Sequence, residues 1–310
     1  MTTVPPILIV IIVRGLCFVI LNSAALGLSV HVRELLESYV ENWKMALAVL
    51  LINFILLPAL ALGFVKLAAG SMPGQLQIGF CMVGLAAGAP FAPKLTGLAR
   101  GNVTMSASLM IPLMVLTVIL LPLELPPVVS AIDSSVKLSA WDVAWPLLVF
   151  FLLPLVIGTL VRLRWQDAAL EGAHVLGVMS LAFLVVHVTL YLYAFWSDVT
   201  GSWGTGEIVA AIAFPLIGVA CGYLLVSILR VEDVGSRHAC EITTGQRNVT
   251  ACILTAIFPL GKYVVTGVSV LIVSIIAIVV LAVFAMEWGR AATHERAATE
   301  TVAPPQHAAG

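Results

Sequence analysis

Nine long apolar stretches, joined by short polar connections, make up most of this chain. Each is close to the ~20 residues that an α-helix needs to cross the hydrocarbon core of a bilayer. We expect transmembrane helices at residues 6–30, 44–68, 74–98, 103–127, 142–163, 173–195, 206–229, 237–258 and 263–287. The pattern predicts an all-α polytopic membrane protein with nine transmembrane helices.

A weak internal repeat relates residues 1–130 to residues 171–288. Each half begins with a plain helix and continues with a helix that carries a proline near its middle, Pro58 or Pro215. A polar, glycine-interrupted third helix follows in both halves. The fifth helix, within residues 131–170, links the two four-helix repeats and inverts the second. Inverted repeats with broken helices at matching places are typical of secondary transporters.

Basic residues predict the orientation of the chain. With the N-terminus outside, only three lysines, at positions 66, 137 and 262, fall on the outer face. The inner face receives Arg33, Lys44, Arg100, Arg162, Arg164, Arg230, Arg290 and Arg296. The positive-inside rule therefore predicts a plasma membrane protein with its N-terminus outside. Residues 289–310 are rich in Ala, Thr, Glu and Pro, and we expect a disordered cytoplasmic tail there.

Composition agrees with a membrane setting and narrows the possible partners. The chain is 61% hydrophobic and only 10% charged, which is far from the composition of soluble domains. A net charge of −1 gives no indication of a nucleic-acid partner. The five cysteines lie in apolar stretches without metal-ligand spacing, so we expect neither disulfides nor a structural metal. No hydrolase or metalloprotease motif is present, which argues against an enzyme.

The eighth apolar stretch carries the most unusual polar residues of the chain. Glu241 lies near its middle, and an acid there costs ~2.5–3.5 kcal/mol on insertion scales. Thr243, Thr244 and Gly245 follow, and we expect the helix to unwind near residues 240–250, which would free carbonyl groups to bind a cation. The remaining polar residues of this stretch include His238, Gln246, Arg247 and Asn248.

The third apolar stretch is expected to break as well, near residues 84–100. Pro90 and Pro93 each remove a backbone donor from a helix, and Gly88 permits a sharp turn. Lys94 follows at once, so its ammonium group can stand beside carbonyls that the break frees. The two interrupted helices together predict a transport site near the middle of the bilayer.

Four segments of the chain resemble one known family. They are Ala25-Leu-Gly-Leu-Ser29, Asn53-Phe-Ile-Leu-Leu-Pro58, Leu98-Ala-Arg-Gly-Asn102, and Glu241 with Gly245-Gln246 and Asn248. In their order and placement they resemble the bile acid:sodium symporter family, within the group of bile acid, arsenite and auxin transporters. The match covers nearly all of the spanning region and is to the nine-helix forms. It implies a panel and a core of helices, with the two broken helices crossing in the core.

The resemblance also implies ion-binding residues. In the family, an acid like Glu241, a glutamine like Gln246 and unwound carbonyls, here those near Thr243 and Thr244, bind one sodium ion. A glutamine approaches that ion where this chain has Asn53, whose side chain also carries an oxygen. The spacing departs from the family pattern Glu-x-Gly-x-Gln-Asn, because Arg247 stands between Gln246 and Asn248.

A second sodium site of the family is expected to be absent. Its Gly-Gly-Thr-x-Ser-Asn segment is replaced by residues 88–94, and only Ser106 remains of two hydroxyl residues in the next helix, because Met110 replaces the threonine. Sodium prefers oxygen ligands. We therefore expect Lys94 to act as a built-in cation, with coupling to protons, or no coupling, as alternatives to sodium.

The embedded charges indicate an anionic substrate. Lys94 and Arg247 outnumber Glu241, so the expected cavity is positive and suits a small organic anion, with His238 and Asn248 beside it. An ion pair between Arg247 and Glu241 is the structural alternative. An arsenite-type exporter, suggested by Cys81, Cys240 and Cys252, and an uncoupled channel or sensor are the other functions considered. The sequence leaves the substrate, the coupling ion and the oligomeric state open.

Overall fold

The computed structural model describes residues 6–68 and 70–302 of the chain. Every regular element in these two ranges is helical. The elements are α1 (Pro6–Ser29), α2 (Val32–Glu41), α3 (Trp43–Leu51), η1 (Ile52–Leu56), α4 (Leu57–Ala68), α5 (Gly74–Leu85), α6 (Ala92–Leu98), α7 (Val103–Ile132), α8 (Ala140–Pro146), η2 (Leu147–Leu152), α9 (Leu153–Arg164), α10 (Gln166–Ala194), α11 (Trp196–Gly201), α12 (Glu207–Ile228), α13 (Val234–Gly245), α14 (Val249–Ile257) and α15 (Val264–Val302).

Within the described ranges, seven continuous segments are long and apolar enough to cross a bilayer. They are Ile7–Ser29, Trp43–Ala68, Val103–Ile132, Ala140–Arg164, Gln166–Ala194, Glu207–Ile228 and Val264–Thr293. Two further segments, α5 with α6 and α13 with α14, are each interrupted. The protein is therefore an all-α, multi-pass membrane protein. Whether the two interrupted segments complete nine spans stays a prediction.

Two of the continuous segments contain a π-helical turn, and each turn is followed by a proline. η1 ends two residues before Pro58, and η2 ends two residues before Pro154. A proline ring inside a helix clashes with the carbonyl four residues earlier, and a wider turn relieves that clash. Asn53 lies in η1 and is fully buried. The proline in the sequence thus accounts for the local distortion that carries Asn53.

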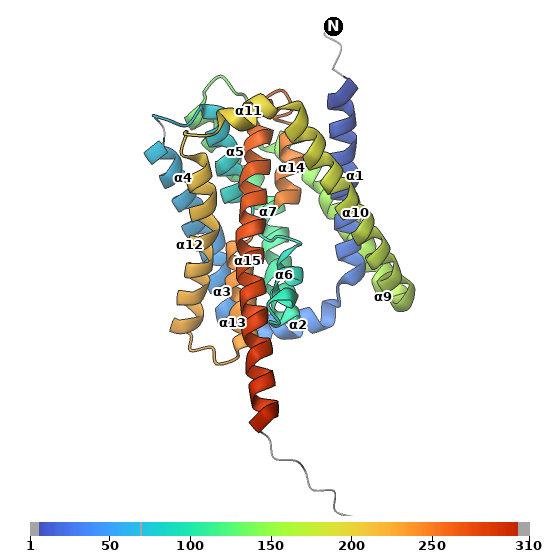
Figure 1. The fold of residues 1–310 in the computed structure, drawn as a ribbon. Coiled ribbons are helices and arrows are strands. Elements are labelled where there is room, and N and C mark those ends of the chain that lie inside the picture. Colours follow the sequence, from blue (N-terminus) through green and yellow to red (C-terminus); the bar gives the residue numbers. More distant parts are fainter. Residues whose placement is uncertain (1–5, 69, 303–310) are drawn as a thin grey trace, which may run out of the picture.

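The helices form a panel and a core. The panel consists of α1, α9 and α10, which pack against one another and lie together at one side of the molecule (Figure 1). The core contains α5, α7, α12, α13 and α15, with α6 and α14 continuing the interrupted segments. Figure 1 also shows α2 crossing between α1 and the core, at the end of the molecule opposite the N-terminus.

Small residues allow the closest helix contacts. A Cβ atom at Gly27 of α1 would lie 2.1 Å from the carbonyl oxygen of Leu155 in α9. In the core, a Cβ atom at Gly222 of α12 would lie 2.7 Å from the Cα atom of Glu241 in α13. Such contacts between backbones are a common way for helices to associate where lipid supplies no hydrophobic driving force.

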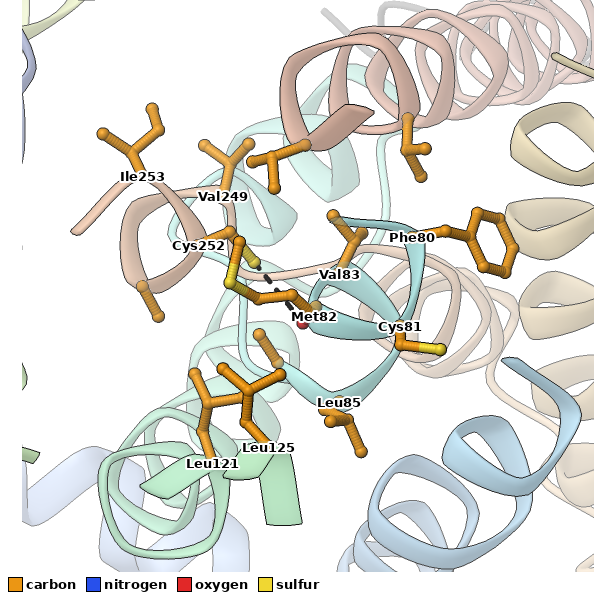
Figure 2. Close-up of a cluster of buried hydrophobic side chains, with 14 of the residues drawn as sticks. Phe80, Cys81, Met82, Val83, Leu85, Leu121, Leu125, Val249, Cys252 and Ile253 are labelled. Carbon is orange, nitrogen blue, oxygen red and sulfur yellow. Dashed lines mark hydrogen bonds between the residues drawn. The ribbon is translucent and has the colours of Figure 1, made fainter. Parts of the chain in front are cut away.

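Side chains of α5, α7 and α14 build the central hydrophobic cluster (Figure 2). Cys81 and Cys252 are both buried in it, and Figure 2 shows the Cys81 side chain pointing away from Cys252. The Cys252 thiol contacts the Met82 carbonyl oxygen at 3.6 Å. Cys240 belongs to a different cluster. In the part of the chain that the structure describes, no group of three His, Cys, Asp or Glu side chains could hold a metal. The thiols therefore pack as small apolar groups.

Two sequence-based expectations need correction at the ends of helices. Residues 32–41 were expected only as part of a short polar connection, but they form α2, an amphipathic helix that buries none of its residues and suits the surface of a membrane. The tail was expected to be disordered from residue 289, but α15 continues to Val302. Alanine and glutamate are strong helix formers, and they extend a helix that the membrane already nucleates. Residues 303–310 lie outside the described part of the chain.

Candidate functional site

The first break separates α5 from α6 at residues 86–91. Gly88 lies in it with φ +74°, a left-handed conformation that favours glycine. Pro90 is within the break, and Pro93 lies in the first turn of α6, where a missing amide hydrogen costs nothing. The interruption predicted for residues 84–100 is therefore present, and the prolines lie at its end.

A threonine of α7 holds the first break in place. The Thr117 hydroxyl accepts a hydrogen bond from the Ala87 amide at 3.0 Å and donates one to the Ala87 carbonyl oxygen at 2.9 Å. Both residues are fully buried. Unwound backbone at membrane depth needs such partners, because lipid offers none. Nothing in the sequence distinguishes Thr117, because one hydroxyl in an apolar helix is ordinary.

The second break separates α13 from α14 at residues 246–248. This break falls within the predicted range of residues 240–250, but the segment Thr243-Thr244-Gly245, which we expected to unwind, forms the last turn of α13. The Gln246 amide still donates to the Ile242 carbonyl oxygen at 2.9 Å, which continues the helical pattern. In a buried segment the amides keep these bonds because no water replaces them. The unwound residues are Gln246, Arg247 and Asn248.

The two breaks touch each other. The backbone amide of Asn248 donates to the Ala86 carbonyl oxygen at 2.9 Å. The Asn248 side chain caps α14, since its Oδ1 accepts from the Ala251 amide at 3.0 Å. Asn248 thus has a structural role at this contact. The two interrupted helices meet at residues distant in sequence.

Arg247 fills the space beside this contact. Its side chain is 3% exposed. Nε donates to the Val83 carbonyl oxygen at 3.2 Å, and one terminal nitrogen donates to Asn53 Oδ1 at 2.7 Å. The other terminal nitrogen donates to the Gly84 carbonyl oxygen. The guanidinium also lies 5.8 Å from the ring centre of Phe214. The end of α5 and the side chain of η1 therefore surround a positive charge.

The ion pair between Arg247 and Glu241, considered above as the structural alternative, does not form in the described residues. In the described residues, only Arg33 with Glu37 and Arg290 with Glu287 form ion pairs within 4.0 Å. Glu241 instead lines a cavity of about 500 Å³ between α12, α13 and α15. His238 lines the same cavity, with its ring stacked on Trp288 at 4.4 Å between ring centres.

The remaining predicted ion ligands have separate surroundings. Asn53 Oδ1 accepts from Arg247, and Nδ2 donates to the Val49 carbonyl oxygen at 2.9 Å. The Ser106 and Thr243 hydroxyls are 3.0 Å apart and join α7 to α13. Thr244 Oγ1 and Gln246 Oε1 are buried without a hydrogen-bond partner in the described part of the chain. The Asn53 side-chain oxygen is therefore already hydrogen-bonded to Arg247. In the described residues, the side-chain oxygens of Thr244 and Gln246 have no hydrogen-bond partner and could bind a cation.

Lys94 lies at a second cavity rather than against the freed carbonyls. This cavity, of about 280 Å³, lies between α1, α2, α6 and α7, beside the first break. Lys94 is exposed, with Nζ 5.3 Å from the ring centre of Phe91. His31 and Glu34 also line the cavity, and neither was among the site residues expected from the sequence. The sequence feature that could have indicated them is the charged segment that forms α2, directly after the first transmembrane helix.

Comparisons with known proteins agree with this architecture. Residues 15–197 match the model of the Sodium Bile acid symporter family, which is more than half of the chain and includes the first break. The chain is also similar to a Bacillus subtilis (strain 168) protein named "Uncharacterized sodium-dependent transporter YocS". The identity is 23% over 237 residues, which cover 75% of this chain and 71% of the relative. The chain therefore belongs to the Sodium Bile acid symporter family of membrane transporters.

Proposed function

We propose that this protein is a secondary active transporter of small organic anions, driven by a sodium or a proton gradient. It resides in the plasma membrane with its N-terminus outside and its C-terminus in the cytoplasm. Family membership supports a transported solute and a multi-pass membrane location. Broken helices that meet inside a core support alternating access around that point.

The observation that carries the substrate class is the cavity at Lys94. Its volume of about 280 Å³ is at the small end of ligand pockets. An exposed ammonium group in a largely apolar cavity beside a helix break suits a carboxylate with a short apolar body. Glu34 also lines the cavity, and its carboxylate disfavours a second negative charge on the substrate. A small monocarboxylate fits this arrangement best.

The contact between panel and core supports a rocking motion. Two side-chain hydrogen bonds cross it in the described residues. Asn22 of α1 donates to Thr250 Oγ1 of α14 at 3.3 Å, and the Tyr191 hydroxyl of α10 donates to the Val264 carbonyl oxygen at 3.0 Å. Two neutral bonds are modest, at about 0.5–1.5 kcal/mol each. The panel can therefore move against the core without breaking a strong polar network.

Uptake into proteoliposomes tests the proposal. A panel of monocarboxylates of increasing size is supplied with an imposed sodium gradient, and separately with an imposed proton gradient. We expect saturable uptake of the small members. Lys94→Gln removes the charge that meets the carboxylate, and a charged hydrogen bond is worth about 1.5–3 kcal/mol. The KM should therefore rise about tenfold or more.

Lys66→Gln is the matched control, because Lys66 is exposed on α4 and lines neither cavity described above. Its uptake should equal that of the wild type. Saturable uptake with the same KM in Lys94→Gln would contradict the proposed substrate site. Single-channel currents in place of saturable uptake would indicate a pore, and the carrier proposal would then fail.

A further inference from the structure

We infer that the guanidinium group of Arg247 is the fixed cation of a cation-binding site where the two broken helices meet. Three oxygen acceptors converge on it: the carbonyl oxygens of Val83 and Gly84, and Oδ1 of Asn53. They come from segments more than 150 residues away in sequence, since the contact from Arg247 to Gly84 spans 163 residues. Oxygen acceptors without hydrogens of their own are the ligands that a hard cation takes.

The electrostatics of α5 explain why a cation is stable there. Val83 and Gly84 lie in the last turn of α5, at its C-terminal and therefore negative end. A buried charge is costly unless hydrogen bonds and charges compensate it. Arginine remains charged in proteins, so it cannot avoid that cost by losing its proton. The carbonyl groups at the end of α5 thus compensate a charge that is permanently present.

Acidic side chains do not take this compensating role by direct contact. Within the described part of the chain, no carboxylate lies within 4.0 Å of the Arg247 guanidinium. Glu124 of α7 forms no ion pair with Arg247, and its buried Oε2 has no hydrogen-bond partner among the described residues. Glu241 lies at the other cavity, beside Arg237. The groups in direct contact with the guanidinium are therefore all neutral dipoles.

A tethered cation changes what this site requires. A sodium ion must bind and leave in each cycle, whereas a guanidinium group on the chain is always present. Because the acceptors are occupied, this position needs no sodium ion. In this structure the guanidinium group joins η1, α5 and the second break. The consequence for transport rests on the proposed function: anion uptake should not require sodium at this position.

Thermal unfolding of the purified, detergent-solubilised protein tests the inference without any substrate. Arg247→Ala empties the site and leaves its three acceptors. We expect the variant to gain stabilisation from millimolar guanidinium or sodium chloride, measured against choline chloride. At a cation concentration about ten times its dissociation constant, the Tm should rise by about 2–4 °C. In the wild type this position is filled, so its rise should be clearly smaller than that of Arg247→Ala.

Two controls make the result specific. In Arg247→Ala combined with Asn53→Leu, one acceptor is gone, so the response should fall at least fivefold in apparent affinity. Arg162→Ala removes a second buried arginine of the described residues, which contacts His31 and the Gln166 carbonyl oxygen near a helix end. That variant should gain no response to cations. If Arg247→Ala stays monodisperse and responds no more than the wild type, the inference is overturned.

A second pair of variants retains Arg247 and so does not depend on an emptied core. Asn53→Asp places a carboxylate where Oδ1 now accepts from Arg247 at 2.7 Å. A counter-charge there should keep the Tm at or above that of the wild type, whereas Asn53→Leu should lower it. An aspartate variant less stable than the leucine variant would overturn the inference. If these stability results hold and uptake of every anion fails, the proposed function is wrong while the cation assignment stands.

Discussion

Replacing Gly88 with alanine is expected to unfold or strongly destabilise the protein. Gly88 has φ +74°, which costs roughly 1–2 kcal/mol for a residue with a Cβ atom. That Cβ atom would also lie 2.3 Å from the backbone nitrogen of Met114, within α7. A helix backbone cannot move aside as a flexible side chain can, and overpacking adds about 1–3 kcal/mol. The total, about 2–5 kcal/mol, is a large share of the stability of a typical protein.

The yield of monodisperse protein and its Tm in detergent measure this effect. Gly204→Ala is the control, because Gly204 has φ +83° but no atom within 4 Å of an added Cβ atom. It carries the backbone strain without the collision and should lose only about 1–2 kcal/mol. Equal losses in the two variants would show that the contact between the first break and α7 contributes nothing.

The second large effect is expected from Thr117→Val, which keeps the side-chain shape and removes the hydroxyl group. The amide and the carbonyl group of Ala87 both lose their partner in a fully buried break. An unsatisfied buried group costs about 1–3 kcal/mol. We therefore expect a lower Tm, and we also expect loss of uptake, because the first break would no longer be held against α7.

Thr255→Val is the matched control for this substitution. Thr255 is equally buried, but its hydroxyl donates to the Ala251 carbonyl oxygen within its own helix, α14. That carbonyl keeps its helical partner, so the control should lose little stability. The same decrease in Tm for both variants would mean that the loss of any buried hydroxyl causes the effect. The hydrogen bonds between Thr117 and Ala87 would then have no special role.

The positions of the breaks illustrate how far a local pattern reaches. Gly88, Pro90 and Pro93 predicted the first break, because proline lacks a donor and glycine permits a left-handed turn. The second break lies directly after the expected residues Thr243 to Gly245, at Gln246 to Asn248. No proline marks it, and its position depends on the contact of Asn248 with Ala86. Asn248 and Ala86 are 162 residues apart, so the sequence around either residue cannot predict their contact.

The partners of the buried charges were the least predictable feature. From the sequence, Lys94 next to the break was the natural cation for the freed carbonyls, and Glu241 the natural partner of Arg247. In the structure, Arg247 takes the carbonyls and Lys94 faces a separate cavity. The charge of a residue and its position in the sequence cannot predict which of these groups contact each other. The direction of each side chain depends on how the helices pack.

Hydrophobic length, proline and glycine are local properties, and the sequence alone therefore determined a multi-pass helical membrane protein with two interrupted segments. The family resemblance rested on short segments of the same kind. The tertiary structure alone decided which carbonyls meet Arg247, that Thr117 clamps Ala87, and that Lys94 and Glu241 line different cavities. These are long-range contacts, fixed by how helices pack in three dimensions rather than by the order of residues along any one helix.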